Sequence, residues 1–198
     1  MIELPNASEI FKDNRKDSYQ DLTEINVRII SDVTFQPLDQ IIYYFCRRFN
    51  LNPKFNIGSY DQLHFEANQN KSRFKEKFIY IHTSLLKYFA KTSKFTHEER
   101  LKQFESQMQQ YIGSVTKISK CNKDCNIIIN LFELPPFRVR GSYSRISGLI
   151  NLVDKINDKL TEIVKDTNNL YLNDINFLSA KIGLDNWYNY TTWASFKQ

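Results

Sequence analysis

The sequence has few of the features that mark fibrous, disulfide-rich or membrane proteins. Its 198 residues include 5 glycines, 5 prolines and 3 cysteines, which excludes a collagen-like or low-complexity chain. No apolar run approaches the roughly 18 residues that a membrane-spanning helix needs. The amino terminus lacks the basic and apolar regions of a secretory signal. Together with the odd number of cysteines, these absences predict a cytoplasmic protein without membrane contact.

Patterns that bind phosphates, metals or nucleic acids are also missing. Neither a Gly-x-Gly-x-x-Gly nor a Walker-type loop occurs. Cys121 and Cys125 have the spacing of half a zinc site, but no second Cys/His pair accompanies them, and we expect no metal. The net charge is +5, with lysines and arginines spread along the chain rather than gathered in a stripe. We therefore expect no nucleic-acid binding; the charge favours solubility or an acidic partner.

The composition itself is that of a folded globular domain. Hydrophobic residues make up 41% of the chain and charged residues 25%, which is ordinary for such a domain. Aromatic residues make up 14%, so ring packing should supply much of the core. The length suits one domain, and no linker or internal repeat is visible. We predict a single domain over residues 25–198, preceded by a helix or arm over residues 1–24.

Strand-like and helix-like segments alternate after residue 24. The strand-like segments are short apolar runs, and the helix-like ones carry apolar residues at three- and four-residue steps. Thr96 and Glu99 form a capping-box pattern ahead of the longest helix. Right-handed crossovers then give an α/β fold, a three-layer α/β/α sandwich with a parallel, flavodoxin-like sheet of about five strands. The expected strands are residues 25–30, 53–57, 77–82, 126–132 and 170–174, and the expected helices are 37–50, 83–90, 96–118 and 146–163.

Polar residues stand where several of these strands end. Ser31 and Asp32 follow the first strand, and Asn130 and Asp174 lie at the ends of the fourth and fifth. The carboxyl ends of parallel strands share one edge, where ligands collect in open α/β sheets. We expect a shared site there; the alternative is that each side chain only caps the next helix or satisfies a turn. His82 ends the third strand near the same edge and is the most interesting of the three histidines.

Two loops should complete this edge. The polar loop 58–62 follows the second strand and should face the loop that begins at Ser31. The loop 133–143 follows the most apolar strand, and its two prolines and glycine predict a rigid segment. Candidate ligand-binding residues in addition to those above are Thr34, Tyr60, Asp61, Arg138, Gly141 and Tyr143.

The segment Ile29-Ile-Ser-Asp-Val-Thr-Phe-Gln36 resembles the first block of SGNH (GDSL-type) hydrolases. More closely, nearly everything after residue 24 is similar to the amino-terminal SGNH-like domain of FkbH-like proteins. The order and spacing of several short pieces carry this resemblance. The pieces are Gly58-Ser-Tyr-Asp-Gln62, Leu134-Pro-Pro-Phe137, Gly141-Ser-Tyr143, Ile156-Asn-Asp-Lys-Leu160, Leu172-Asn-Asp174 and the ending with Gly183, Trp187, Tyr188, Trp193 and Lys197.

The resemblance implies a neighbouring domain of the haloacid-dehalogenase (HAD) superfamily. That domain carries an Asp-x-Asp-x-Thr nucleophile motif and Mg²⁺, and some family members are thought to transfer a glyceryl unit to an acyl carrier protein. Others accompany polysaccharide gene sets. The motif is absent from these 198 residues, so we expect no cofactor here, and the chain looks like an excised fragment or a stand-alone copy. The expected partners are an acyl carrier protein or a covalently linked HAD-like domain.

The departures from the SGNH pattern bear directly on function. With Asp32 and Thr34 aligned, the nucleophilic serine falls on Val33, and no histidine follows His97 to act as its base. We therefore expect a catalytically degenerate domain that binds an acyl or glyceryl carrier protein, or a saccharide precursor, for a HAD-like phosphatase or acyltransferase in polyketide or polysaccharide biosynthesis. Arg138 and Arg140 would suit a phosphopantetheine phosphate or an acidic carrier-protein helix.

Two other functions stay open. If the alignment slips by one residue, Ser31 could serve an esterase or deacylase with His82 as base, which makes Ser31, Asp32, His82 and Asp174 the catalytic candidates. Alternatively, the domain is a structural module that forms a homodimer through its aromatic tail. The tail residues in question are Trp187, Tyr188 and Trp193.

Overall fold

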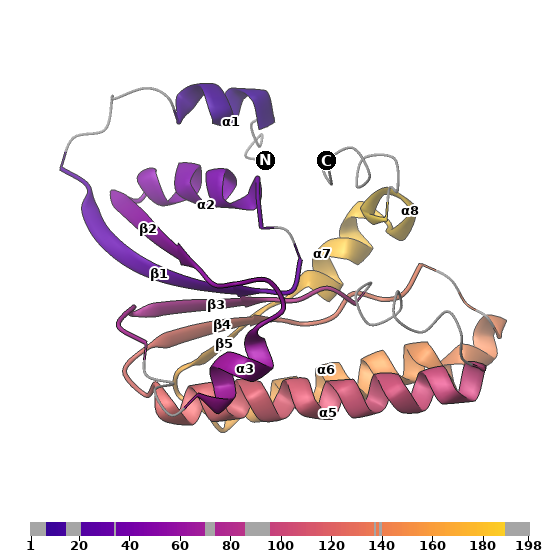
Figure 1. The fold of residues 1–198 in the computed structure, drawn as a ribbon. Helices are drawn as coiled ribbons and strands as arrows, with labels where there is room; N and C mark the ends of the chain where they lie inside the picture. Colours follow the sequence, from indigo (N-terminus) through magenta and orange to yellow (C-terminus); the bar gives the residue numbers. More distant parts are fainter. Residues whose placement is uncertain are drawn as a thin grey trace.

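The protein is a parallel α/β sandwich, seen here in a computed structural model (Figure 1). Within the described residues the sheet has five strands in the order β2-β1-β3-β4-β5, with helices on both faces. The predicted three-layer fold is therefore confirmed. The structure describes residues 7–14, 21–33, 35–69, 74–85, 96–136, 138 and 140–188.

The five predicted strands are all present, with ends shifted by up to two residues. They are β1 (Thr23–Ser31), β2 (Leu51–Ile57), β3 (Phe78–His82), β4 (Asn126–Asn130) and β5 (Leu170–Asn173). The helices are α1 (Ala7–Asp13), α2 (Leu38–Arg47), α3 (Leu63–Asn68), α5 (His97–Cys121), α6 (Leu149–Lys165), α7 (Ile175–Ile182) and α8 (Leu184–Trp187), with a 3₁₀ helix η1 (Gly141–Arg145). Most of the predicted helix 83–90 lies outside the described residues.

The strand order reverses at β1, and this reversal sorts the helices into two layers. The chain steps from β1 outward to β2, then crosses back to β3 and continues through β4 to β5. All four neighbouring pairs run parallel. Right-handed crossovers in opposite directions place their helices on opposite faces. In Figure 1, α1, α2, α7 and α8 lie over one face, and α3, α5 and α6 lie over the other.

The largest part of the core lies between the sheet and the α5/α6 layer. Alternate residues of β3 and β4 point into it, and Ile79, Ile81, Ile127 and Ile129 are at most 1% exposed. Burying an aliphatic side chain of this size contributes about 1.5–3 kcal/mol. The predicted burial of the fourth strand is confirmed. The helices contribute Phe104, Met108, Val115, Ile118, Val153 and Leu160 to the same cluster.

The predicted helix beginning at residue 146 starts later than expected. Ile146 follows η1 and is 70% exposed, so it does not belong to the buried stripe. Gly148 has a φ of +133°, a backbone conformation that residues with a side chain rarely adopt. A helix cannot pass through this residue. Helix α6 therefore begins at Leu149. The capping box is confirmed, since the Thr96 hydroxyl accepts from the Glu99 N–H and the Glu99 carboxylate accepts from the Thr96 N–H.

Candidate ligand-binding edge of the sheet

The carboxyl ends of β1 and β3 meet where the strand order reverses. This position is the usual ligand crevice of open α/β folds. Ser31 and His82 are register partners there, on adjacent strands. The backbone N–H of Asp61 donates to the Ser31 carbonyl at 3.1 Å. The loop after β2 therefore faces the loop after β1, as the sequence predicts.

The Ser31 hydroxyl makes its hydrogen bonds within its own turn. Its side-chain oxygen donates to the Val33 carbonyl at 2.7 Å and accepts from the Val33 N–H at 3.2 Å. The residue is only 6% exposed. Such short-range bonds are how a serine stabilises a turn at the end of a strand. Within the described residues, no hydrogen bond joins the Ser31 hydroxyl to an imidazole.

Asp32 is a buried carboxylate that joins the ends of β1 and β3. It is 5% exposed. The Thr83 hydroxyl donates to its Oδ2, and the Ser84 N–H donates to its Oδ1 at 3.2 Å. Its own N–H donates to the His82 carbonyl at 3.3 Å. These bonds compensate for the hydration that a buried carboxylate loses. They also hold the loop after β1 against the residues that follow β3.

His82 belongs to a cluster of uncharged polar groups that spans β3, β4 and β5. The Tyr80 hydroxyl lies 2.9 Å from His82 Nδ1 and donates to Asn130 Oδ1 at 3.0 Å. Asn130 Nδ2 lies 3.2 Å from the same imidazole nitrogen. Asn173 Nδ2 donates to Asn130 Oδ1 at 3.0 Å. The structure thus brings Asn130 and His82 together with Tyr80 and Asn173, two residues that were not among the candidates.

Burial holds the His82 ring in its neutral form. It lowers the pKa of His82 from 6.5 to about 4. The hydrogen bonds agree with this direction, because Asn130 Nδ2 is a donor and requires an unprotonated Nδ1 as its acceptor. Burial also raises the pKa of Tyr80, and its hydrogen bonds with Asn130 and Asn173 oppose this shift. At neutral pH the cluster therefore presents hydrogen-bonding groups without charge.

Glu133 is a buried carboxyl at this edge that the sequence reasoning missed. Burial raises the pKa of Glu133. Hydrogen bonds with its own backbone, with Tyr188 and with the Leu85 backbone oppose this shift, and the nearby charge of Asp32 adds to it. Glu133 is 5% exposed. The sequence offered a clue to its role, since Glu133 begins the loop that follows the buried strand β4 and is predicted to line the edge.

The other predicted site residues are arranged in different ways. Asp174 accepts from the Phe177 N–H at 2.9 Å and so caps α7, which is the alternative reading of that residue. Tyr60 and Tyr143 are 64% and 53% exposed, at the surface of the two loops. Arg138 and Gly141 also lie on an exposed loop, where the Gly141 N–H donates to the Arg138 carbonyl at 3.2 Å. Thr34 lies outside the described residues.

The aromatic tail is partly folded into the domain. Tyr188 is 8% exposed, and its hydroxyl donates to the Leu134 carbonyl at 3.0 Å. Trp187 is half-buried, and Trp193 lies outside the described residues. Tyr188 therefore packs against the loop after β4 rather than forming an exposed patch.

The described residues of the edge offer hydrogen-bonding groups at the ends of β1, β3, β4 and β5. Among the described residues at the edge, Ser31 is bonded to its own turn and His82 to Tyr80 and Asn130, and no hydrogen bond joins the two. A serine–histidine contact lies elsewhere, between α3 and α5, where Ser114 Oγ is 3.2 Å from His64 Nδ1 and donates to the Gln110 carbonyl. They also contain no group of three or more His, Cys, Asp or Glu placed to hold a metal ion. No helix in this part of the chain is long and apolar enough to cross a membrane.

These features define an open α/β domain of flavodoxin-like strand order with a polar edge at the carboxyl ends of its strands. The chain belongs to the FkbH N-terminal domain family, whose model matches residues 26–197. The structure is similar to the N-terminal part of the protein BF1531 from Bacteroides fragilis, which contains a phosphatase domain complexed with Mg. The TM-score is 0.75 at 18% sequence identity, over 91% of this chain and 48% of the other, so this chain spans about half the length of that one. No curated protein matches the sequence.

Proposed function

We propose that this domain binds a carrier-linked acyl or glyceryl group, or a saccharide precursor, without hydrolysing it, and presents it to a HAD-like phosphatase or acyltransferase domain. The observation that carries the proposal is the state of Ser31 and His82, which are adjacent in register but hydrogen-bonded to different groups. An edge that holds donors and acceptors without an activated nucleophile is suited to binding. The similarity to a protein with a phosphatase domain supports the choice of partner. The resemblance to SGNH hydrolases remains a prediction.

The loop after β4 supplies the charge that a carrier protein would meet. Arg138 and Arg140 are both exposed, and the chain as a whole carries a net charge of +5. Arginine binds phosphate oxygens through charge-assisted, often paired hydrogen bonds. Complementary charge also accelerates the encounter with an acidic partner. An acyl carrier protein offers both a phosphopantetheine phosphate and an acidic helix, so it is the favoured ligand.

A binding titration tests this function. Isothermal calorimetry would compare a holo acyl carrier protein with its apo form, using this domain and an Arg138→Glu/Arg140→Glu variant. We expect the holo form to bind and the variant to weaken binding by roughly tenfold or more. A Lys120→Glu/Lys123→Glu variant is the matched control, because it makes the same charge change at the amino end of β4 and should bind normally. Equal affinities for the wild type and both variants would overturn the proposal.

A further inference from the structure

The hydrogen bonds around His82 determine which of its ring nitrogens carries the proton. The carboxamide oxygen of Asn130 accepts from the Tyr80 hydroxyl at 3.0 Å and from Asn173 Nδ2 at 3.0 Å. The other end of that carboxamide, the Nδ2 donor, therefore points to His82 Nδ1, 3.2 Å away. If Nδ1 carried the proton, two N–H groups would face each other across this distance. The neutral imidazole thus accepts at Nδ1 and carries its proton on Nε2.

This tautomer makes His82 a hydrogen-bond donor rather than a general base. A histidine that activates a serine accepts the hydroxyl proton at Nε2 and keeps its own proton on Nδ1, where an acceptor orients it. Here Nδ1 is the accepting nitrogen, because Asn130 offers it a donor. The proton on Nε2 leaves that nitrogen able only to donate.

The Nε2–H group is available to a ligand. In the part of the chain that the structure describes, it makes no hydrogen bond, and the buried polar atoms without a partner lie on other residues. The half-buried imidazole ends β3 where the strand order reverses, the usual ligand position of this fold class. The Phe35 ring packs edge-on against the imidazole, with 6.0 Å between the centroids, and so limits its rotation.

The charge beside this donor disfavours an anionic ligand. Asp32 lies at the same edge, since its N–H donates to the His82 carbonyl at 3.3 Å. The negative charge of Asp32 acts on its surroundings, because it adds to the rise in the pKa of Glu133. Arg138 and Arg140 are exposed on the loop after β4, where salt and water screen their charge. An uncharged ligand group therefore suits the His82 donor best.

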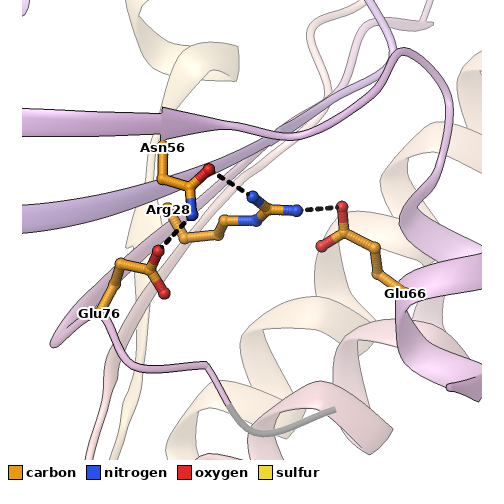
Figure 2. A network of polar contacts seen from close by, with 4 residues as sticks. All are labelled: Arg28, Asn56, Glu66 and Glu76. Atoms are coloured by element: carbon orange, nitrogen blue, oxygen red, sulfur yellow. Dashed lines mark hydrogen bonds and ion pairs between the residues drawn. The ribbon is translucent and has the colours of Figure 1, made fainter. Parts of the chain in front are cut away.

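The arginine of β1 lies on the other face of the sheet (Figure 2). Arg28 is three residues before Ser31, the register partner of His82, so strand alternation turns it away from the imidazole. Its guanidinium donates to Glu66 Oε1 at 2.6 Å and to Asn56 Oδ1 at 2.8 Å. Glu66 offsets the charge of Arg28 on that face, so Arg28 does not draw an anion to the His82 edge.

We propose that His82 Nε2–H donates a hydrogen bond to the carbonyl oxygen of the acyl group that this edge binds. A neutral N–H donor fits an uncharged carbonyl oxygen, whereas a free carboxylate is repelled by Asp32. The inference rests on the proposed function. It narrows the ligand from acyl, glyceryl or saccharide groups to one that presents a carbonyl oxygen, such as a thioester.

NMR spectra of the domain labelled with ¹⁵N in its histidines test this inference. Long-range ¹H–¹⁵N correlations show which ring nitrogen of each histidine is protonated, and the His82 signals are identified by their absence in a His82→Gln variant. We expect the proton on Nε2. We also expect S-acetyl-N-acetylcysteamine, a small acyl thioester, to shift the His82 Nε2 signal in a saturable way. N-acetylcysteamine, which lacks the thioester, and acetate, which is charged, should not shift it.

Two substitutions at the same position separate the donor from the rest of the ring. Gln places an N–H group near the position of Nε2, whereas Asn reaches only the position of Nδ1. His82→Asn should weaken thioester binding by roughly three- to tenfold, and His82→Gln should bind as the wild type does. Backbone amide signals of Ser31 and Asp32 report binding in both variants. His64→Gln, at an exposed position on α3, is the matched control and should bind normally.

The outcomes that would overturn the inference are separate from those of the carrier-protein titration. They are a proton on Nδ1, no saturable shift with the thioester, an equal response to N-acetylcysteamine or acetate, and equal thioester binding by the Gln and Asn variants. The small probes carry no phosphate and no protein, so their binding does not depend on Arg138 or Arg140. Loss of carrier binding with an intact thioester response would therefore count against the proposed carrier contact alone.

Discussion

Ser31 and His82 are register partners on adjacent parallel strands, but their polar atoms are hydrogen-bonded to different groups. The serine hydroxyl bonds only within its own turn, to the backbone of Val33. The imidazole lies against Tyr80 and Asn130. A serine hydrolase needs the hydroxyl and the imidazole bonded to each other. The pair is thus brought to one edge of the sheet without being assembled into a catalytic unit.

The buried His82 should make stability fall as the pH falls. Its pKa is about 4 in the fold and 6.5 in the unfolded chain, so the unfolded chain takes up the proton first. The neutral imidazole contributes fully to the free energy of unfolding above pH 6.5. Between about pH 6.5 and 4 the free energy of unfolding falls by on the order of 3 kcal/mol. His82→Asn should remove this part of the slope, whereas His64→Asn, at an exposed position on α3, should keep it. Urea unfolding at several pH values measures both, and equal slopes in the two variants would contradict the account.

Glu133 should act in the opposite direction. Because burial raises its pKa, the fold holds the proton of this carboxyl more tightly than the unfolded chain does. The favourable contribution is present at low pH and is lost as the pH rises through the raised pKa. Glu133→Gln keeps a polar side chain of the same shape and removes the charge, so its gain in unfolding free energy should be larger at pH 8 than at pH 4. Glu98→Gln, at an exposed position on α5, is the control and should show no such difference.

Gly58 permits the close approach of α3 to the sheet. A Cβ at this position would lie 2.7 Å from Glu66 Oε1 and 3.2 Å from the Ile29 carbonyl. Gly58→Ala should therefore displace Glu66 and cost about 1–3 kcal/mol of unfolding free energy. Gly113→Ala in α5 is the matched control, because a Cβ there meets nothing within 4 Å, and it should stabilise by about 0.5–1 kcal/mol. If thermal unfolding ranked the two variants the other way, the close contact between Gly58 and Glu66 would not limit the side chain at position 58.

Asn157 joins α6 to the segment that leads into the Glu133 loop. Its amide donates to the Phe132 carbonyl at 2.7 Å and accepts from the Phe132 N–H at 2.8 Å, in a buried position. Asn157→Ala removes both bonds and should cost about 3 kcal/mol. Asn151→Ala, on the same helix, loses one exposed bond and should cost less than about 1 kcal/mol. If chemical denaturation gave the two variants similar losses of unfolding free energy, the buried pair of hydrogen bonds would not stabilise the fold more than the exposed one.

The layered fold follows from local patterns, and so does the place of the candidate edge. Apolar strands that alternate with amphipathic helices allow few arrangements, and the ends of parallel strands necessarily share an edge. Ser31, Asp32, His82 and Asn130 could therefore be placed there from the sequence. What the sequence could not decide is which of these side chains bond to one another, since that depends on rotamers and register.

The members that were missed have physical explanations. Tyr80 lies two residues before His82, so strand alternation puts both on one face, but within an apolar run it reads as a core residue. Helix α3 is only six residues long and carries no apolar repeat. The Arg28–Glu66 pair joins residues that are 38 positions apart, and it forms because β1 lies beside β2 in the sheet. No local pattern predicts such a contact.

The claim that the edge binds without covalent chemistry is tested most directly with a fluorophosphonate probe and intact-mass spectrometry. The probe forms a stable adduct only with an activated serine. Because the Ser31 hydroxyl is bonded to the Val33 backbone, we predict no adduct under conditions that fully label a control serine hydrolase. An adduct that maps to Ser31 and disappears in both Ser31→Ala and His82→Asn would contradict the account and establish an esterase or deacylase.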